Sequence, residues 1–131
     1  MLPVAIRVLL ALFYAYGAVV HVLNMLSLTG FDWAEAPLRW QVLDVVYLLL
    51  DVLVVYGLLR ARAFGTVALI GAACSQVVLY TVLREWILDV PPAFAVTEEQ
   101  RSYLDGLVAF HVVTLLLVTV SWRRKRQTAE Q

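Results

Sequence analysis

The chain has 131 residues, of which 63% are hydrophobic and 15% charged, and its ten basic and ten acidic side chains leave no formal net charge. A soluble domain of this composition would have too few polar side chains to cover its surface, so the ordinary soluble classes are excluded. With Cys74 as the single cysteine, an internal disulfide, a CxxC redox pair and a cysteine-based metal cage are excluded as well.

Four apolar runs follow one another along the chain, at residues 4–28, 38–59, 63–88 and 103–122. Each is long enough to cross a hydrocarbon core of ~30 Å as a helix that rises ~1.5 Å per residue. Because lipid offers no hydrogen-bond partners to the backbone, runs of this length without alternation are predicted to be helices. The sequence therefore predicts an all-α integral membrane four-helix bundle, formed as a single domain by residues 1–131.

Local signals indicate where these helices begin and end. Pro3 and Pro37 suit the first turn of the first and second helices, where a missing N–H costs nothing. Thr29 and Gly30 are expected to end the first helix. Residues 97–100, Thr-Glu-Glu-Gln, have the spacing of a capping box and predict the start of the fourth helix.

Cations gather at one end of the predicted bundle. Arg60 and Arg62 lie in the connection between the second and third helices, and residues 123–126 follow the fourth helix as Arg-Arg-Lys-Arg. Since cytoplasmic loops carry the excess of Lys and Arg, both termini are predicted to be cytoplasmic, in a bacterial cytoplasmic (inner) membrane. Indoles tend to mark membrane interfaces, which places tryptophans at the outer boundary (Trp33, Trp40 and Trp86) and at the inner one (Trp122).

Polar and ionisable side chains interrupt all four apolar runs. Such groups are expensive in lipid, so a buried polar cluster is the default place to expect function. Helical spacing places the polar residues of each of the first three helices on one stripe, mostly toward the outer end. His21 and His111 come at similar distances from the outer ends of their helices, so we expect them at matching depth. The predicted ligand-binding residues of this outer-half cavity are His21, Asn24, Asp44, Tyr47, Asp51, Gln76, Tyr80, Arg84 and His111.

Part of this cluster also has a purely structural interpretation. Arg84 is expected to pair with Asp44 or Asp51, because an intramembrane Arg nearly always has a partner. Each histidine, taken singly, is explained by a neutral ring hydrogen-bonded to a neighbouring amide or hydroxyl. Asp105 is expected at the outer rim of the bundle, and Tyr14 as a packing residue.

The favoured functional hypothesis is a non-catalytic binding or accessory subunit, because no catalytic signature is present. In this hypothesis the outer cavity holds a hydrophobic ligand such as a quinone or a lipid, which a bundle interior with few polar groups suits. The same surface can instead dock the chain into a larger membrane complex or a homo-oligomer. The expected surroundings are the lipid bilayer, and no nucleic-acid partner is expected.

Two alternatives give the polar residues a chemical role. In one, His21 and His111 are the axial ligands of a b-type haem, with Gly17 leaving room for the ring, or hold a metal ion together with Asp44 or Asp51. In the other, paired acids near a histidine move protons on a sterol or isoprenoid substrate, with Asp51 as the proton donor.

Two stretches of the chain resemble a known family. Residues 7–17 open on an Arg and an apolar run and end in Phe-Tyr-Ala-Tyr-Gly, and residues 51–59 place an acid before Gly-Leu-Leu. They resemble the DoxX-like four-helix membrane proteins, with His21 in place of that family's lysine, which implies an accessory role beside respiratory or thiol-stress enzymes. In topology, buried acids and basic tail the chain is also similar to the EXPERA group of sterol-isomerase and sigma-2-receptor-like bundles, from which no catalytic residue is carried over.

Overall fold

The computed structural model describes residues 2–129, and its regular elements are all helical. In chain order the elements are α1 (Val4–Met25), α2 (Leu38–Leu59), α3 (Ala63–Tyr80), α4 (Arg84–Leu88), the 3-10 helix η1 (Pro92–Phe94) and α5 (Glu98–Ala129). No strand occurs among these described residues, which confirms the predicted all-α class.

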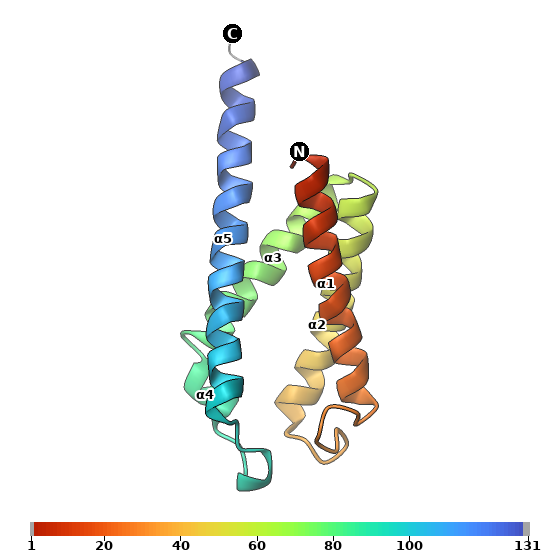
Figure 1. Ribbon diagram of the computed structural model, residues 1–131, viewed down its shortest axis with the longest axis vertical. Helices are drawn as coiled ribbons and strands as arrows, with labels where there is room; N and C mark the ends of the chain where they lie inside the picture. Colours follow the sequence, from red (N-terminus) through yellow and green to blue (C-terminus); the bar gives the residue numbers. More distant parts are fainter. Residues whose placement is uncertain (1, 130–131) are drawn as a thin grey trace.

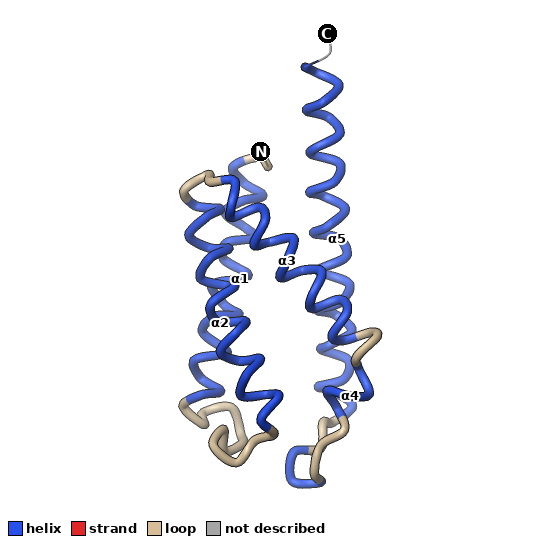
Figure 2. The backbone as a smooth tube through the Cα atoms, turned by 180° about the vertical axis from the view of Figure 1, so that it is seen from behind, coloured by secondary structure: helices blue, strands red, loops and turns tan. Residues whose placement is uncertain are grey.

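The helices form a close pair and a third helix that bridges to the last. α1 and α2 lie side by side, and α3 crosses from this pair to α5 (Figure 1). Figure 2 shows the same crossing from behind. The N-terminus, the α2–α3 turn and the C-terminal part of α5 lie together at one end of the molecule, the terminal end (Figure 1). Residues 26–37 and 89–97 form the opposite end, the loop end.

Two glycines allow α2 and α3 to meet at the terminal end. A Cβ atom added to Gly57 would lie 2.3 Å from the Cα atom of Gly65, which is closer than any real contact of that kind. Small residues permit such close helix crossings inside membranes, where packing replaces the hydrophobic effect as the driving force. The contact keeps α2 and α3 together at their turn and leaves them free to diverge toward the loop end.

The core is divided into two parts. The larger part lies toward the terminal end, where Leu10, Val54, Leu58 and Leu69 are buried against one another. The smaller part joins the second helix to α3 and α4 near the loop end and contains the buried residues Tyr47, Leu79 and Ile87. Both parts contact partly buried Leu50, so they are continuous along α2.

The third apolar run is not one helix, which corrects the prediction for residues 63–88. α3 ends at Tyr80, and α4 begins only at Arg84. The Thr81 hydroxyl donates to the Val77 carbonyl (2.6 Å) at the break. The Trp40 indole N–H donates to the Ile87 carbonyl (2.9 Å), which holds α4 against α2. A straight continuation of α3 would have carried this segment away from α2.

The other helix boundaries differ less from the predictions. α1 ends at Met25, before Gly30, because Ser27 adopts the left-handed conformation (φ 57°) and the Leu28 N–H donates back to the Leu23 carbonyl (2.9 Å). Pro3 and Pro37 occupy the N-cap positions, immediately before the first helical residue.

The capping box predicted at residues 97–100 is confirmed. The Thr97 N–H donates to Gln100 Oε1 (2.8 Å), and the Gln100 N–H donates to Thr97 Oγ1 (3.2 Å). This reciprocal pair satisfies two backbone donors that a helix start otherwise leaves open. α5 accordingly begins at Glu98, earlier than the predicted apolar run.

Four helical segments are long and apolar enough to cross a membrane: α1, α2, α3 and the Glu98–Arg123 part of α5. Their outward faces carry many large apolar side chains, such as Leu9 (68% exposed) and Leu38 (73% exposed). An apolar surface of this extent is far larger than soluble monomers expose and suits contact with lipid. The four helices therefore suggest an integral membrane protein.

Candidate functional site

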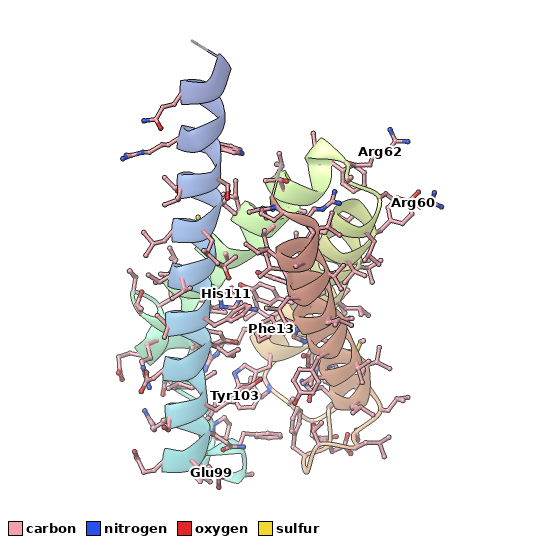
Figure 3. All side chains as sticks on the ribbon, turned by 45° about the horizontal axis from the view of Figure 1, so that its top comes forward. Phe13, Arg60, Arg62, Glu99, Tyr103 and His111 are labelled. Atoms are coloured by element: carbon pink, nitrogen blue, oxygen red, sulfur yellow. The ribbon has the colours of Figure 1, made fainter. Side chains whose placement is uncertain are left out.

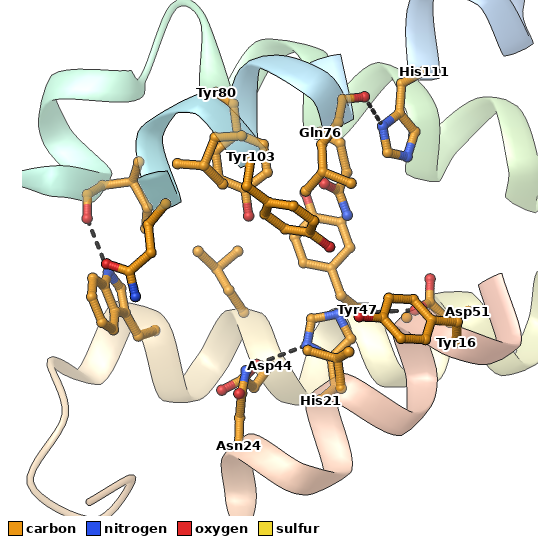
Figure 4. A pocket seen from close by; sticks show the side chains of 18 of the residues that line it. Tyr16, His21, Asn24, Asp44, Tyr47, Asp51, Gln76, Tyr80, Tyr103 and His111 are labelled. Atoms are coloured by element: carbon orange, nitrogen blue, oxygen red, sulfur yellow. Dashed lines mark hydrogen bonds and ion pairs between the residues drawn. The ribbon is translucent and has the colours of Figure 1, made fainter. Parts of the chain in front are cut away.

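A cavity of about 300 Å³ lies toward the loop end, between α1, α2, α3 and α5. Its walls are mainly apolar and aromatic, with contributions from Phe13, Val20, Leu104 and Leu107. Figure 4 shows this cavity with most of its lining side chains. The structure places eight of the nine predicted site residues on its wall: His21, Asn24, Asp44, Tyr47, Asp51, Gln76, Tyr80 and His111.

Asp44 is the centre of a hydrogen-bonded group at one side of the cavity. His21 Nδ1 lies 2.7 Å from Asp44 Oδ1, and the Asn24 amide donates to the same oxygen (2.9 Å). The Trp33 indole N–H donates to the other oxygen, Oδ2 (2.9 Å). A carboxylate only accepts, so Nδ1 carries the proton in its bond to Asp44. These three donors, from α1 and from the α1–α2 loop, satisfy a buried carboxylate on α2.

Asp51 lies beyond the opposite edge of the same histidine ring. His21 Nε2 is 3.9 Å from Asp51 Oδ2, and Asp51 is only 3% exposed. A Cβ atom added to Gly17 would lie 2.6 Å from Asp51 Oδ2, so the carboxylate occupies the space that a side chain at position 17 would need. Gly17 was expected to make room for a haem ring, but the group beside it is Asp51.

Tyr47 links the His21 group to α3. Its ring lies nearly parallel to the His21 ring, with centroids 6.0 Å apart. The Tyr47 hydroxyl donates to Ser75 Oγ (3.1 Å), and the Ser75 hydroxyl donates in turn to the Ala72 carbonyl (2.9 Å). The polar groups contributed by α1, α2 and α3 are thus connected on this side of the cavity.

His111 has a different environment, on α5. Its Nδ1 atom is 2.6 Å from the Leu107 carbonyl one turn earlier, and the residue is only 1% exposed. The rings of Phe13, Tyr14 and Phe110 surround it edge-on, and Phe13 also stacks on Phe110. This aromatic group connects α1 with α5 at the cavity wall (Figure 3).

Three buried polar atoms on the cavity wall have no hydrogen-bond partner in the part of the chain whose side chains the structure describes. They are the Nε2 atom of His111, the hydroxyl of Tyr14 and the Oε1 atom of Gln76. A buried donor or acceptor without a partner costs about 1–3 kcal/mol. Tyr14 was expected only as a packing residue, and its ring is indeed buried, but its hydroxyl belongs to this set.

Arg84 does not belong to the cavity, which corrects its predicted pairing with Asp44 or Asp51. Its guanidinium forms an ion pair with Asp105 on α5 and also lies 3.4 Å from the Arg101 carbonyl. The hydrogen bond to Asp105 raises the pKa of Arg84 above its usual value. The break after Tyr80 places Arg84 in α4, out of the stripe that a continuous α3 would have formed.

The predicted metal set is not assembled either. Among the described residues, no group of three or more His, Cys, Asp and Glu side chains is arranged to hold an ion. The two nitrogens of His21 point in diverging directions, one toward Asp44 and the other toward Asp51. The Nδ1 atom beside Asp44 carries the proton of that hydrogen bond, so it has no lone pair for a metal ion that Asp44 would share.

Trp33, which bonds to Asp44, is a second residue whose part in the site the sequence analysis missed, after Tyr14. Its position near a predicted helix end indicated an interfacial indole. The loop instead folds back, because Ser27 Oγ accepts from the Trp33 N–H (3.0 Å) and Asp32 Oδ1 accepts from the Ala34 N–H (3.0 Å). The Ser and Asp in this loop are turn-forming residues and were the available signal.

The comparisons with known proteins give no further information on this site. The DoxX-like and EXPERA resemblances stay predictions from the sequence. No protein-family model, no curated protein and no solved structure matches the chain.

Proposed function

We propose that the chain is an integral protein of a bacterial cytoplasmic membrane, with both termini in the cytoplasm. Arg60 and Arg62 lie at the terminal end, and Glu99 lies at the loop end (Figure 3). The basic residues 123–126 belong to the same terminal end by their place in the chain. Because positive charge stays on the cytoplasmic side, the terminal end is cytoplasmic and the cavity lies in the outer half of the membrane.

In that position the cavity binds one small, largely apolar molecule that carries polar groups, such as a quinone or a lipid. The observation that carries this proposal is the set of partnerless polar atoms of Tyr14, Gln76 and His111 on an otherwise apolar wall. Ligand sites combine apolar walls with a few polar groups of this kind, and about 300 Å³ is the lower end of their usual volume.

Fluorescence quenching by a small quinone tests the proposal directly. Trp40 lines the cavity and Trp33 bonds to Asp44, so a quinone bound there should quench both indoles. The protein is placed in lipid nanodiscs with Trp86 and Trp122 replaced by Phe, and menadione is titrated. Saturable quenching, above that of empty nanodiscs with free tryptophan, is expected.

A matched pair of substitutions on α5 provides the control. Leu104→Phe adds volume at the cavity wall and should weaken the quenching, whereas Leu116→Phe makes the same change on the exposed surface and should not. Equal quenching in both variants would contradict the proposal. A stoichiometric partner protein that co-purifies with a non-binding wild type would favour an accessory subunit instead.

Acid–base chemistry on the bound molecule is the second candidate function. The favouring observation is the position of His21 between Asp44 and Asp51, with its Nδ1 atom 2.7 Å from Asp44 and its Nε2 atom 3.9 Å from Asp51. A carboxylate that orients one imidazole nitrogen prepares the other to transfer a proton. Incorporation of deuterium from heavy water into an unsaturated isoprenoid should then require Asp51 and survive Asp105→Asn.

A further inference from the structure

We infer that the molecule bound in the cavity donates a hydrogen bond to His111, so that an apolar alcohol, phenol or quinol binds more tightly than the matching ketone, quinone or ether. The inference rests on the proposed binding function and adds the chemical class of the ligand. It depends on which nitrogen of His111 carries the proton and on what surrounds the other nitrogen.

The Leu107 carbonyl decides the tautomer. A carbonyl oxygen only accepts hydrogen bonds, so the Nδ1 atom that lies 2.6 Å from it must carry the proton. In a neutral imidazole the other nitrogen, Nε2, then has a lone pair and acts as an acceptor. His111, which belongs to the residues that line the cavity, therefore has a buried acceptor at Nε2.

The ring of His111 is neutral because nothing near it compensates a charge. None of the ion pairs between described side chains involves His111, whereas both carboxylates of the cavity wall lie near His21. Burial without a counter-ion strongly disfavours the imidazolium. The two acids thus lie beside His21, and the acceptor without a partner belongs to His111.

No donor on the described side chains bonds to the Nε2 atom. Phe13 and Phe110 have no polar atoms, and the nearby Thr114 hydroxyl already donates to the Phe110 carbonyl (2.9 Å). Tyr14 contacts the His111 ring edge-on, with centroids 6.0 Å apart, but its hydroxyl and His111 Nε2 do not bond to each other within the described chain. A donor from the ligand satisfies this atom, and a carbonyl or ether oxygen does not.

The rest of the wall suits the body of such a molecule. Val20, Leu104 and Leu107 are apolar, and Tyr80 and Tyr103 add ring faces. In Figure 4, His111 lies at one corner of the cavity and His21 at another side, so a ligand hydroxyl at His111 leaves its apolar body in the space between them. A site built around a hydroxyl rejects an analogue without it, because its own polar atom then stays unpaired.

A pair of probes that differ by one O-methyl group, and therefore in whether the oxygen carries a hydrogen, tests the inference. 2-Naphthol and 2-methoxynaphthalene share one ring system, but only the first can donate a hydrogen bond. Their affinities are measured by equilibrium dialysis of the full chain in nanodiscs, corrected with empty nanodiscs. We expect wild-type protein to bind the naphthol about tenfold or more tightly than the ether.

Two variants assign this preference to His111. His111→Phe keeps an aromatic ring but removes the acceptor, so the two probes should bind with equal affinity. Thr114→Val removes a polar group from the same helix away from the cavity wall and should keep the preference. Nitrogen NMR of histidine-labelled protein should show an unprotonated Nε2 atom in His111, whether or not a ligand binds.

The outcomes separate this inference from the proposal on which it rests. If both probes bind wild type equally well, or the ether binds better, the inference fails while cavity binding stands. If neither probe binds above empty nanodiscs, the proposed binding function fails. Competition by a prenyl alcohol or by a short-chain quinol then identifies the source of the hydroxyl, and either result supports the inference.

Discussion

His21 and His111 line the same cavity but differ in their bonding. His21 has Asp44 on one nitrogen and Asp51 near the other, and its partner Asp44 is bonded three times. His111 has one bond to its own helix, and its second nitrogen has no partner in the described chain. This difference in bonding is why we propose the His21 side as a structural framework and the His111 side as the place where a ligand adds binding energy.

The largest loss of stability is expected when the carboxylate of Asp44, the group with the most hydrogen bonds, is removed. Asp44→Ala leaves His21, Asn24 and Trp33 without their shared acceptor, so we expect a loss of about 3–5 kcal/mol in the free energy of unfolding. Reversible unfolding by denaturing detergent in mixed micelles measures it. Asp105→Ala removes a carboxylate that is 63% exposed and should cost less than about 1 kcal/mol. Equal losses in the two variants would refute a framework centred on Asp44.

A smaller effect is expected where Asp51 contacts α1. Gly17→Ala places a methyl group 2.6 Å from Asp51 Oδ2, and the displaced carboxylate should cost about 1–3 kcal/mol of stability. Gly71→Ala is the matched control, because nothing lies within 4 Å of its added Cβ atom. That variant should be as stable as wild type or gain up to about 1 kcal/mol, since alanine favours helices over glycine. The same unfolding assay measures both variants. Destabilisation by both substitutions would contradict a specific contact between Gly17 and Asp51.

Trp33 tests whether the loop belongs to the framework. Trp33→Phe keeps an aromatic ring but removes the indole donor to Asp44 Oδ2, which should cost about 1–2 kcal/mol. Trp86→Phe removes an indole that bonds to no carboxylate in the described residues and should cost clearly less. If thermal unfolding gives the opposite order, the Trp33 bond contributes nothing to stability.

The smallest change is expected at His111. His111→Phe removes one nitrogen that has no partner among the described side chains and one that bonds only to the Leu107 carbonyl of its own helix, so the free energy of unfolding should stay within about 1 kcal/mol of wild type. His21→Phe, which leaves Asp44 short of a donor, should cost more. Comparable losses in the two variants would show that the difference in hydrogen bonding between the two histidines does not affect the free energy of unfolding.

Much of the cavity could be predicted because helical periodicity is local. Residues spaced by three, four or seven share a face, so Asp44, Tyr47 and Asp51 were placed on one stripe of α2 before any packing was known. Arg84 was misplaced by the same reasoning. Its spacing from Gln76 and Tyr80 assumes a continuous helix, and the break after Tyr80 removes that assumption.

The sequence by itself determined that four long apolar helices form and that Asp44, Tyr47 and Asp51 share one inward stripe, because apolar length and periodicity are properties of each segment alone. Only the tertiary structure decided the partners: Asp44 for His21, Asp105 for Arg84, and the loop indole of Trp33 for Asp44. Those choices depend on the order of helices around the bundle, on the break between α3 and α4, and on the fold of the loops. The open nitrogen of His111 follows from the same arrangement, since α5 packs on α3 and meets α1 through aromatic rings that offer it no donor.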